Sequence, residues 1–163
     1  MPLLLMLALL APAACDGSSG PADQAGADAG SGTDPGSGTG NDSVPSCPFT
    51  AAQVSDLLGQ PMTDEGNCLF GDGKGVASLT ITMASQTAGA TTYDYQHDQA
   101  GKIYDKVVDL DHGDRSYVAA KDIEGQAVVV SPKGSYTLTM SSFGMDVGTY
   151  EQKLRALLDA ILA

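Results

Sequence analysis

Residues 76–85 read VASLTITMAS, and from Ala77 to Met83 apolar and hydroxyl-bearing side chains alternate one by one. A period of two is typical of a β-strand with one face in a core and the other face polar. Residues 135–142, SYTLTMSS, repeat the alternation. Strands of this kind belong to antiparallel sheets that are covered on one face. These two stretches therefore predict such a sheet, with a Ser/Thr-rich face that points to solvent or to a partner.

The segments around these two strands complete the predicted fold. The stretch 48–61, PFTAAQVSDLLGQP, predicts a helix with a capping box formed by Thr50 and Gln53 and a stop at Gly59. Helical spacing also appears in 91–106 and from Tyr150 to the last residues, where Thr149 and Gln152 suggest a second capping box. Further strands are predicted in 106–110, 115–120 and 126–131, and SPKG (131–134) predicts a tight turn with positive φ at Gly134.

The order of these elements predicts an α+β fold. Short turns join sequential strands, which favours a mainly antiparallel sheet of about five to six strands. The three helices are expected to cover one face, as a two-layer sandwich.

The chain divides into three parts. Residues 1–14 are apolar but too short to span a bilayer, and they fit the core of a signal peptide. Residues 15–46 are rich in Gly, Ser and Asp and predict a disordered tether. Residues 47–163 carry the periodicity of the folded domain. The net charge of −12 offers no basic surface for nucleic acid.

An exported protein with three cysteines, Cys15, Cys47 and Cys68, leaves one of them without a disulfide partner. Cys15 directly follows two alanines after the apolar run and resembles the lipobox cysteine of bacterial lipoproteins, which is lipidated. Pro12 and the lack of a basic residue before the run depart from that pattern. Lipidation of Cys15 would leave Cys47 and Cys68 to form a disulfide. The alternatives to lipidation are simple secretion with Cys15 left in the tail and a cytoplasmic chain. The alternative to the disulfide is two buried free thiols.

A resemblance to a known family supports this interpretation. The residues Cys47-Pro48-Phe49-Thr50, Leu57-Leu58-Gly59 and Cys68-Leu69-Phe70 are similar to the opening of small actinobacterial lipoproteins of unassigned function, although the Trp often found after the second Cys is missing. Residues 107–120 are similar to their Gly-Asp-x-x-Tyr strand. There is also a fainter similarity to the extracellular sensor domains of receptor kinases. The resemblance implies an exported, lipid-anchored α+β domain and carries no assigned chemistry.

Candidate site residues are few. His97 and His112 are the only histidines, and each has Asp neighbours. No Gly-x-Ser-x-Gly nucleophile pattern occurs in the folded part. The acidic stretch 109–114 does not match an EF-hand, and no metal or other cofactor is predicted. The Gly-rich FGDGKG (70–75) predicts a hairpin turn. Tyr93 and Tyr95 are two residues apart on a predicted helix, so one of them is expected to be exposed as a contact residue.

These observations favour a non-enzymatic binding domain, anchored to the cell membrane by a lipid on Cys15. Its expected partner is an unknown envelope protein or small ligand, contacted through Tyr93, Tyr95, His97 or His112. The alternatives are an envelope hydrolase with a non-standard His/Asp site and a passive surface-coat protein.

Overall fold

A computed structural model describes residues 42–163. The elements, in chain order, are α1 (Ala51–Leu58), β1 (Thr63–Asp64), β2 (Leu69–Gly71), β3 (Ser78–Ala84), α2 (Gln86–Ile103), β4 (Lys106–Leu110), β5 (Arg115–Lys121), β6 (Glu124–Ser131), β7 (Gly134–Ser141) and α3 (Val147–Leu162). None of the helices in this range is both long and apolar enough to cross a membrane. The predicted signal peptide, Cys15 and nearly all of the predicted tether lie outside the described residues.

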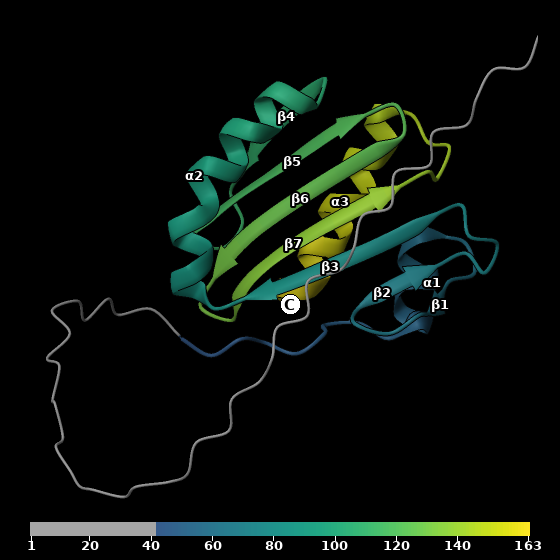
Figure 1. Cartoon of the computed structure of the whole chain (residues 1–163), viewed down its shortest axis with the longest axis horizontal. Coiled ribbons are helices and arrows are strands. Elements are labelled where there is room, and N and C mark those ends of the chain that lie inside the picture. The colour runs from purple at the N-terminus through teal and green to yellow at the C-terminus, as the bar shows by residue number, and fades with distance from the viewer. Residues whose placement is uncertain (1–41) are drawn as a thin grey trace, which may run out of the picture. The chain divides into compact units, whose positions relative to one another are not determined.

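The strands form one antiparallel sheet in the order β1-β2-β3-β7-β6-β5-β4 (Figure 1). Two runs of sequential strands, β1 to β3 and β4 to β7, meet where β3 pairs with β7. The predicted α+β class and antiparallel sheet are confirmed. The described sheet has seven strands, which is more than the predicted five to six, because the two-residue strand β1 adds an edge that no pattern predicted.

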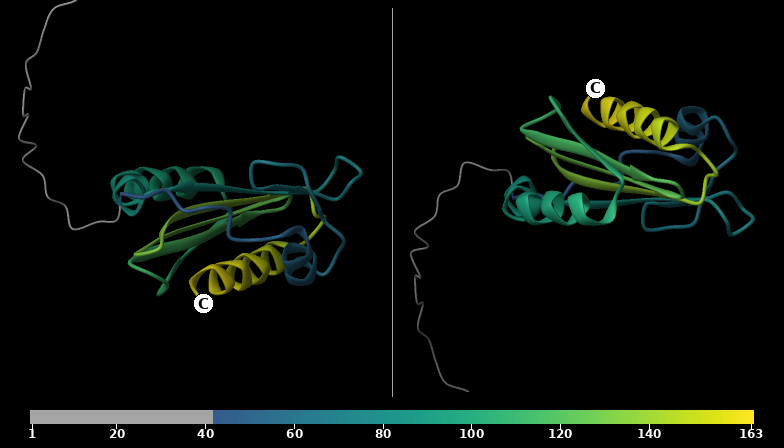
Figure 2. Two further views of the ribbon diagram at one scale, coloured as in Figure 1. Left: turned by 90° about the horizontal axis from the view of Figure 1, so that it is seen from below. Right: turned by 90° about the horizontal axis from the view of Figure 1, so that it is seen from above.

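The helices lie on both faces of the sheet, so the prediction that all three cover one face was wrong. Figure 2 shows α2 on one face and α3 with α1 on the other. Neighbouring strand residues divide accordingly: Tyr117 and Val128 pack towards α2, whereas Val118 and Val129 belong to the core under α1 and α3. The reason is that β5 and β6 are apolar on both sides and need cover on both.

The larger core lies between the sheet and the helices α1 and α3. The apolar positions of the alternating stretches point into it, as predicted, and are almost fully buried: Leu79, Ile81, Leu138 and Met140. They pack against the apolar side of α3, formed by Tyr150, Leu154, Leu157, Leu158 and Ile161. Burial of each such side chain stabilises the fold by about 1.5–3 kcal/mol.

Local signals in the sequence set the position of α1. The side chain of Thr50 accepts a hydrogen bond from the Gln53 backbone N–H, and the Gln53 side chain accepts one from the Thr50 backbone, so the predicted capping box is confirmed. Gly59 ends the helix with φ 75°. Cys47 and Cys68 form the predicted disulfide, with 5.6 Å between their Cα atoms, and join the segment before α1 to β2.

Helix α3 is capped and held at its first turns. Its N-cap is Asp146, whose carboxylate accepts a hydrogen bond from the Thr149 N–H, so the helix begins before the box expected at Thr149. Glu151 contacts the Lys106 ammonium of β4 and the Arg155 guanidinium. These two groups hold the pKa of Glu151 below its ordinary value.

The described segment before Cys47 reaches the sheet at one of its ends. Pro45 lies against Gly134, where β7 begins, beside the carbonyl of Ala84, where β3 ends. A Cβ on Gly134 would come within 2.7 Å of the Pro45 ring, and Gly134 has φ 125°, the positive φ predicted for the SPKG turn. The β2–β3 turn and the segment after β7 lie at the opposite end of these antiparallel strands.

Candidate functional site

Tyr93 is one of the four predicted contact residues, and it is buried between α2 and the sheet. Its ring packs edge-on against Tyr117 of β5, with 5.6 Å between centroids, and the Arg115 guanidinium lies 4.1 Å above its centre. Arg115 also forms an ion pair with Asp94, which lowers the pKa of that carboxyl. Burial is the main cause that raises the pKa of Tyr93. Tyr93 therefore attaches α2 to the sheet and offers little surface to a ligand.

His97 extends the same aromatic cluster by one helical turn. Its ring packs against Tyr93 and Tyr117, with centroids 6.0 and 5.1 Å away, and its Nε2 lies 2.8 Å from a carboxylate oxygen of Asp109 on β4. The Tyr117 hydroxyl donates to Gln126 instead. Within the described residues no hydroxyl group is hydrogen-bonded to the His97 imidazole, so the cluster does not contain the hydroxyl–imidazole pair of a Ser-His-Asp site.

His112 lies in the β4–β5 turn and contacts α3. Its Nε2 is 2.7 Å from a carboxylate oxygen of Asp159, and its buried Nδ1 has no hydrogen-bond partner within the described part of the chain. Asp159 lies in α3, whereas His97 belongs to α2 on the opposite face of the sheet. The two histidines are therefore not brought together into one site.

Tyr95 is the predicted contact residue that is free to meet a ligand. Its side chain is 70% exposed, and it lies on the outer side of α2 in line with Gln99 and Ile103. With the strand β6 these residues form a groove of about 280 Å³. We call this hollow the α2 groove. It is lined by Tyr95, Gln96, Gln99, Ala100, Ile103, Tyr104, Glu124 and Gln126.

Glu124 supplies the one carboxylate that lines the α2 groove, and neighbouring groups balance its negative charge. Glu124 accepts a hydrogen bond from the Tyr104 hydroxyl, and the Lys121 ammonium lies 3.9 Å from it and 5.1 Å from the centre of the Tyr104 ring. Burial, followed by the contact with Glu124, raises the pKa of Tyr104, so its hydroxyl stays protonated and donates. The groove thus combines apolar side chains with amides and carries little net charge.

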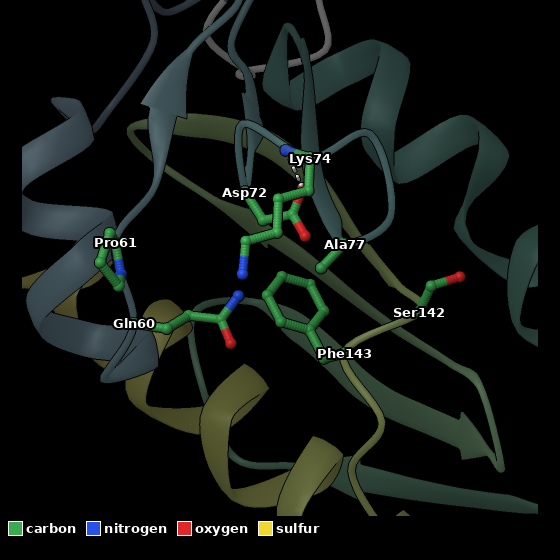
Figure 3. Close-up of a pocket in the computed structure, with 7 residues that line it drawn as sticks. All are labelled: Gln60, Pro61, Asp72, Lys74, Ala77, Ser142 and Phe143. Atoms are coloured by element: carbon green, nitrogen blue, oxygen red, sulfur yellow. Dashed lines mark hydrogen bonds between the residues drawn. The ribbon is translucent and has the colours of Figure 1, made fainter.

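A second hollow of about 280 Å³ opens at the end of the sheet far from Pro45 (Figure 3). Three separate loops supply Gln60, Lys74 and Phe143, and Figure 3 shows the Lys74 side chain extending between the Gln60 amide and the Phe143 ring. Asp72 accepts hydrogen bonds from the backbone N–H groups of Lys74 and Val76, which lower its pKa. Its carboxylate shapes the predicted hairpin turn of FGDGKG, and the turn is confirmed.

Sequence reasoning missed most of the residues that line the two hollows. Gln99 and Gln126, and likewise Gln60 and Phe143, come from elements that are distant in the sequence and carry no motif. The exposed position of Tyr95 was the one available signal, since two Tyr residues two apart cannot both face inward. Across residues 42–163, no cluster of His, Cys, Asp and Glu is arranged to hold a metal ion.

Comparison of the whole chain with protein-family models, with curated proteins and with solved structures finds no match in any of the three.

Proposed function

We propose that this chain is an exported, lipid-anchored protein of the cell envelope whose domain 47–163 binds an envelope protein or small ligand without catalysis. The observation that carries the proposal is the disulfide between Cys47 and Cys68. Disulfides persist in oxidising compartments outside the cytoplasm. Because this pair accounts for two of the three cysteines, Cys15 is left over at the end of the apolar run.

The sequence before the domain supports the anchor. Cys15 follows Ala13 and Ala14, as in the lipobox that it resembles, and the stretch after it is too poor in large apolar residues to fold. A Gly/Ser-rich chain of this length spans roughly 30 Å on average, enough to hold a domain off a membrane surface. The resemblance to small actinobacterial lipoproteins, which implies a lipid anchor, supports the same proposal.

The placement of the hollows supports a binding role. The tether joins the domain beside Gly134, and the hollow around Lys74 opens at the opposite end of the sheet. An anchored domain would therefore present this end away from its attachment. Neither histidine ring meets a hydroxyl group in the described residues, which favours recognition over hydrolysis.

The anchor is tested by intact-mass analysis of the protein purified from the membrane fraction. We expect a chain that begins at Cys15 and carries the mass of a diacylglyceryl group. The matched control is Cys15→Ser, which should lose both the added mass and the membrane fractionation. An unmodified full-length chain would contradict the proposal.

A further inference from the structure

A polar surface extends from the α2 groove across the sheet. Gln126 and Glu124 line the groove, and they pair directly with Thr139 and Ser141 of β7. Directly paired residues of antiparallel strands lie on the same face of a sheet. The same face therefore continues from β7 to its neighbour β3, which also carries hydroxyl groups on this side.

We call this surface the hydroxyl face. It consists of three cross-strand pairs between β3 and β7: Ser78 with Ser141, Thr80 with Thr139 and Thr82 with Thr137. Strand geometry places the two residues of each pair about 4.8 Å apart, and it places successive pairs about 7 Å apart along the strands. Thr80 and Thr82 are exposed, and none of the six hydroxyl groups has a hydrogen-bond partner within residues 42–163. This row of free donors and acceptors lies beside the α2 groove and is not covered by α2.

We propose that the hydroxyl face and the α2 groove together bind a neutral polysaccharide. This inference rests on the binding function proposed above and names its ligand. A hydroxyl or amide group both donates and accepts hydrogen bonds, and so does each hydroxyl of a sugar. The surface offers six hydroxyl groups and the amides of Gln96, Gln99 and Gln126 in one continuous area.

The charges of the protein favour a neutral polysaccharide over a charged one. The chain carries a net charge of −12, which repels an anionic polymer. Lys121, a cation beside the α2 groove, is already shared between Glu124 and the Tyr104 ring. The residues that line the groove therefore offer no unpaired ammonium to a carboxylate or sulfate, and its compensated carboxylate gives a cation little to bind.

Two exposed side chains of the α2 groove offer apolar surface to a sugar ring. Tyr95 is 70% exposed and Ile103 is 53% exposed, and both line the groove from α2. An aromatic ring with a polar tip packs against an apolar surface while it keeps its hydroxyl group in water. The C–H face of a pyranose ring is such a surface. Tyr95 is thus expected to stack on a sugar while the glutamines and threonines bind its hydroxyl groups.

The test is native affinity electrophoresis of the full chain in gels that contain dextran, mannan or xylan, with hyaluronan as the anionic comparison. We expect at least one neutral polysaccharide to retard the protein and hyaluronan to leave it unaffected. Tyr95→Ala, Gln99→Ala and Thr139→Val should each weaken the retardation at least five-fold. The matched control is Gln152→Ala, an exposed glutamine of α3 on the other face.

Three results would overturn the inference: no retardation by any of the neutral polymers, retardation by hyaluronan alone, and equal retardation of the wild type and all three variants. Thermal unfolding of each variant shows whether a loss of binding is a loss of fold. The gel assay uses the full chain whether it purifies with the membrane or not. A failure here is therefore distinct from a missing lipid on Cys15.

Discussion

Substitution of Gly89 tests how closely α2 approaches the sheet. A Cβ at this position would lie 2.1 Å from the Cβ of Ser135 on β7 and 2.3 Å from its Oγ. Carbon atoms in contact are about 3.5–4.0 Å apart, so the helix or the strand must move. Overpacking of this kind costs about 1–3 kcal/mol, whereas the helix propensity of Ala returns up to about 1 kcal/mol. Gly89→Ala should therefore lower the free energy of unfolding by up to about 2 kcal/mol.

The same helix provides the control. A Cβ added to Gly101 would meet no other side chain or strand of the described domain within 4 Å, so Gly101→Ala encounters no obstacle. It should raise the free energy of unfolding by about 0.5–1 kcal/mol, because Ala has less backbone entropy to lose than Gly. Urea denaturation measures both values, and thermal unfolding should follow with shifts of about 4 °C per kcal/mol.

Opposite signs for the two substitutions are the expected result. If Gly89→Ala stabilises the protein as much as Gly101→Ala does, α2 does not lie on β7 as described. A double-mutant cycle with Ser135→Gly adds a second check, since removal of the Ser135 Cβ should recover most of the loss. A loss that persists in the double variant would place the strain elsewhere.

Three further predictions concern the opposite face of the sheet, where α1 and α3 pack, and the disulfide next to α1. Cys47→Ala, which opens the bridge to Cys68, should lower the free energy of unfolding by about 3 kcal/mol, and the wild type in reductant should match it in urea titrations. Equal stability with and without reductant would mean that the bridge is absent. Glu151→Gln should cost about 0.5–1 kcal/mol at pH 7. Because the pKa of Glu151 is lowered in the fold, its contribution is present above the ordinary pKa and is lost as the pH falls through the folded value, so urea titrations of the two proteins should converge at a pH below that folded value. A difference that stays constant with pH would refute this assignment. Tyr150→Phe should cost about 1–2 kcal/mol in thermal unfolding, because the N–H of Phe143 donates to the Tyr150 hydroxyl over 3.0 Å and would lose its partner. An unchanged melting temperature would show that water replaces the hydroxyl.

Local patterns predicted the elements well. The alternation in 76–85 and 135–142 gave the two central strands with their correct buried positions, and Thr50, Gln53 and Gly59 gave the bounds of α1. These signals succeed because each depends on residues within a few positions of one another.

The arrangement of the layers was harder to predict. The hydrophobic alternation of β3 shows one buried face, yet β5 and β6 contain unbroken apolar runs such as Val128-Val129-Val130. Such a run signals burial on both faces. Helix α2 covers the second of these faces, and its apolar stripe is weak because Gly89, Tyr93 and Ala100 alone are buried. The α2 groove could not be predicted for a related reason, since Gln99 and Gln126 become neighbours only through the packing of α2 on β6.

If the chain is exported as we propose, the pairing of β3 with β7 has a consequence for how it folds. Strand β7 is the last strand of the described chain and occupies the middle place in the sheet, so the outer edge of β3 has no partner strand until residues 134–141 arrive. A chain that crosses a membrane from its N-terminus would deliver α1 and β1 to β3 long before that partner. Contacts between residues so far apart in sequence form slowly. The early half is therefore expected to wait on the outer side as an incomplete sheet, and the arrival of one strand completes both halves at once.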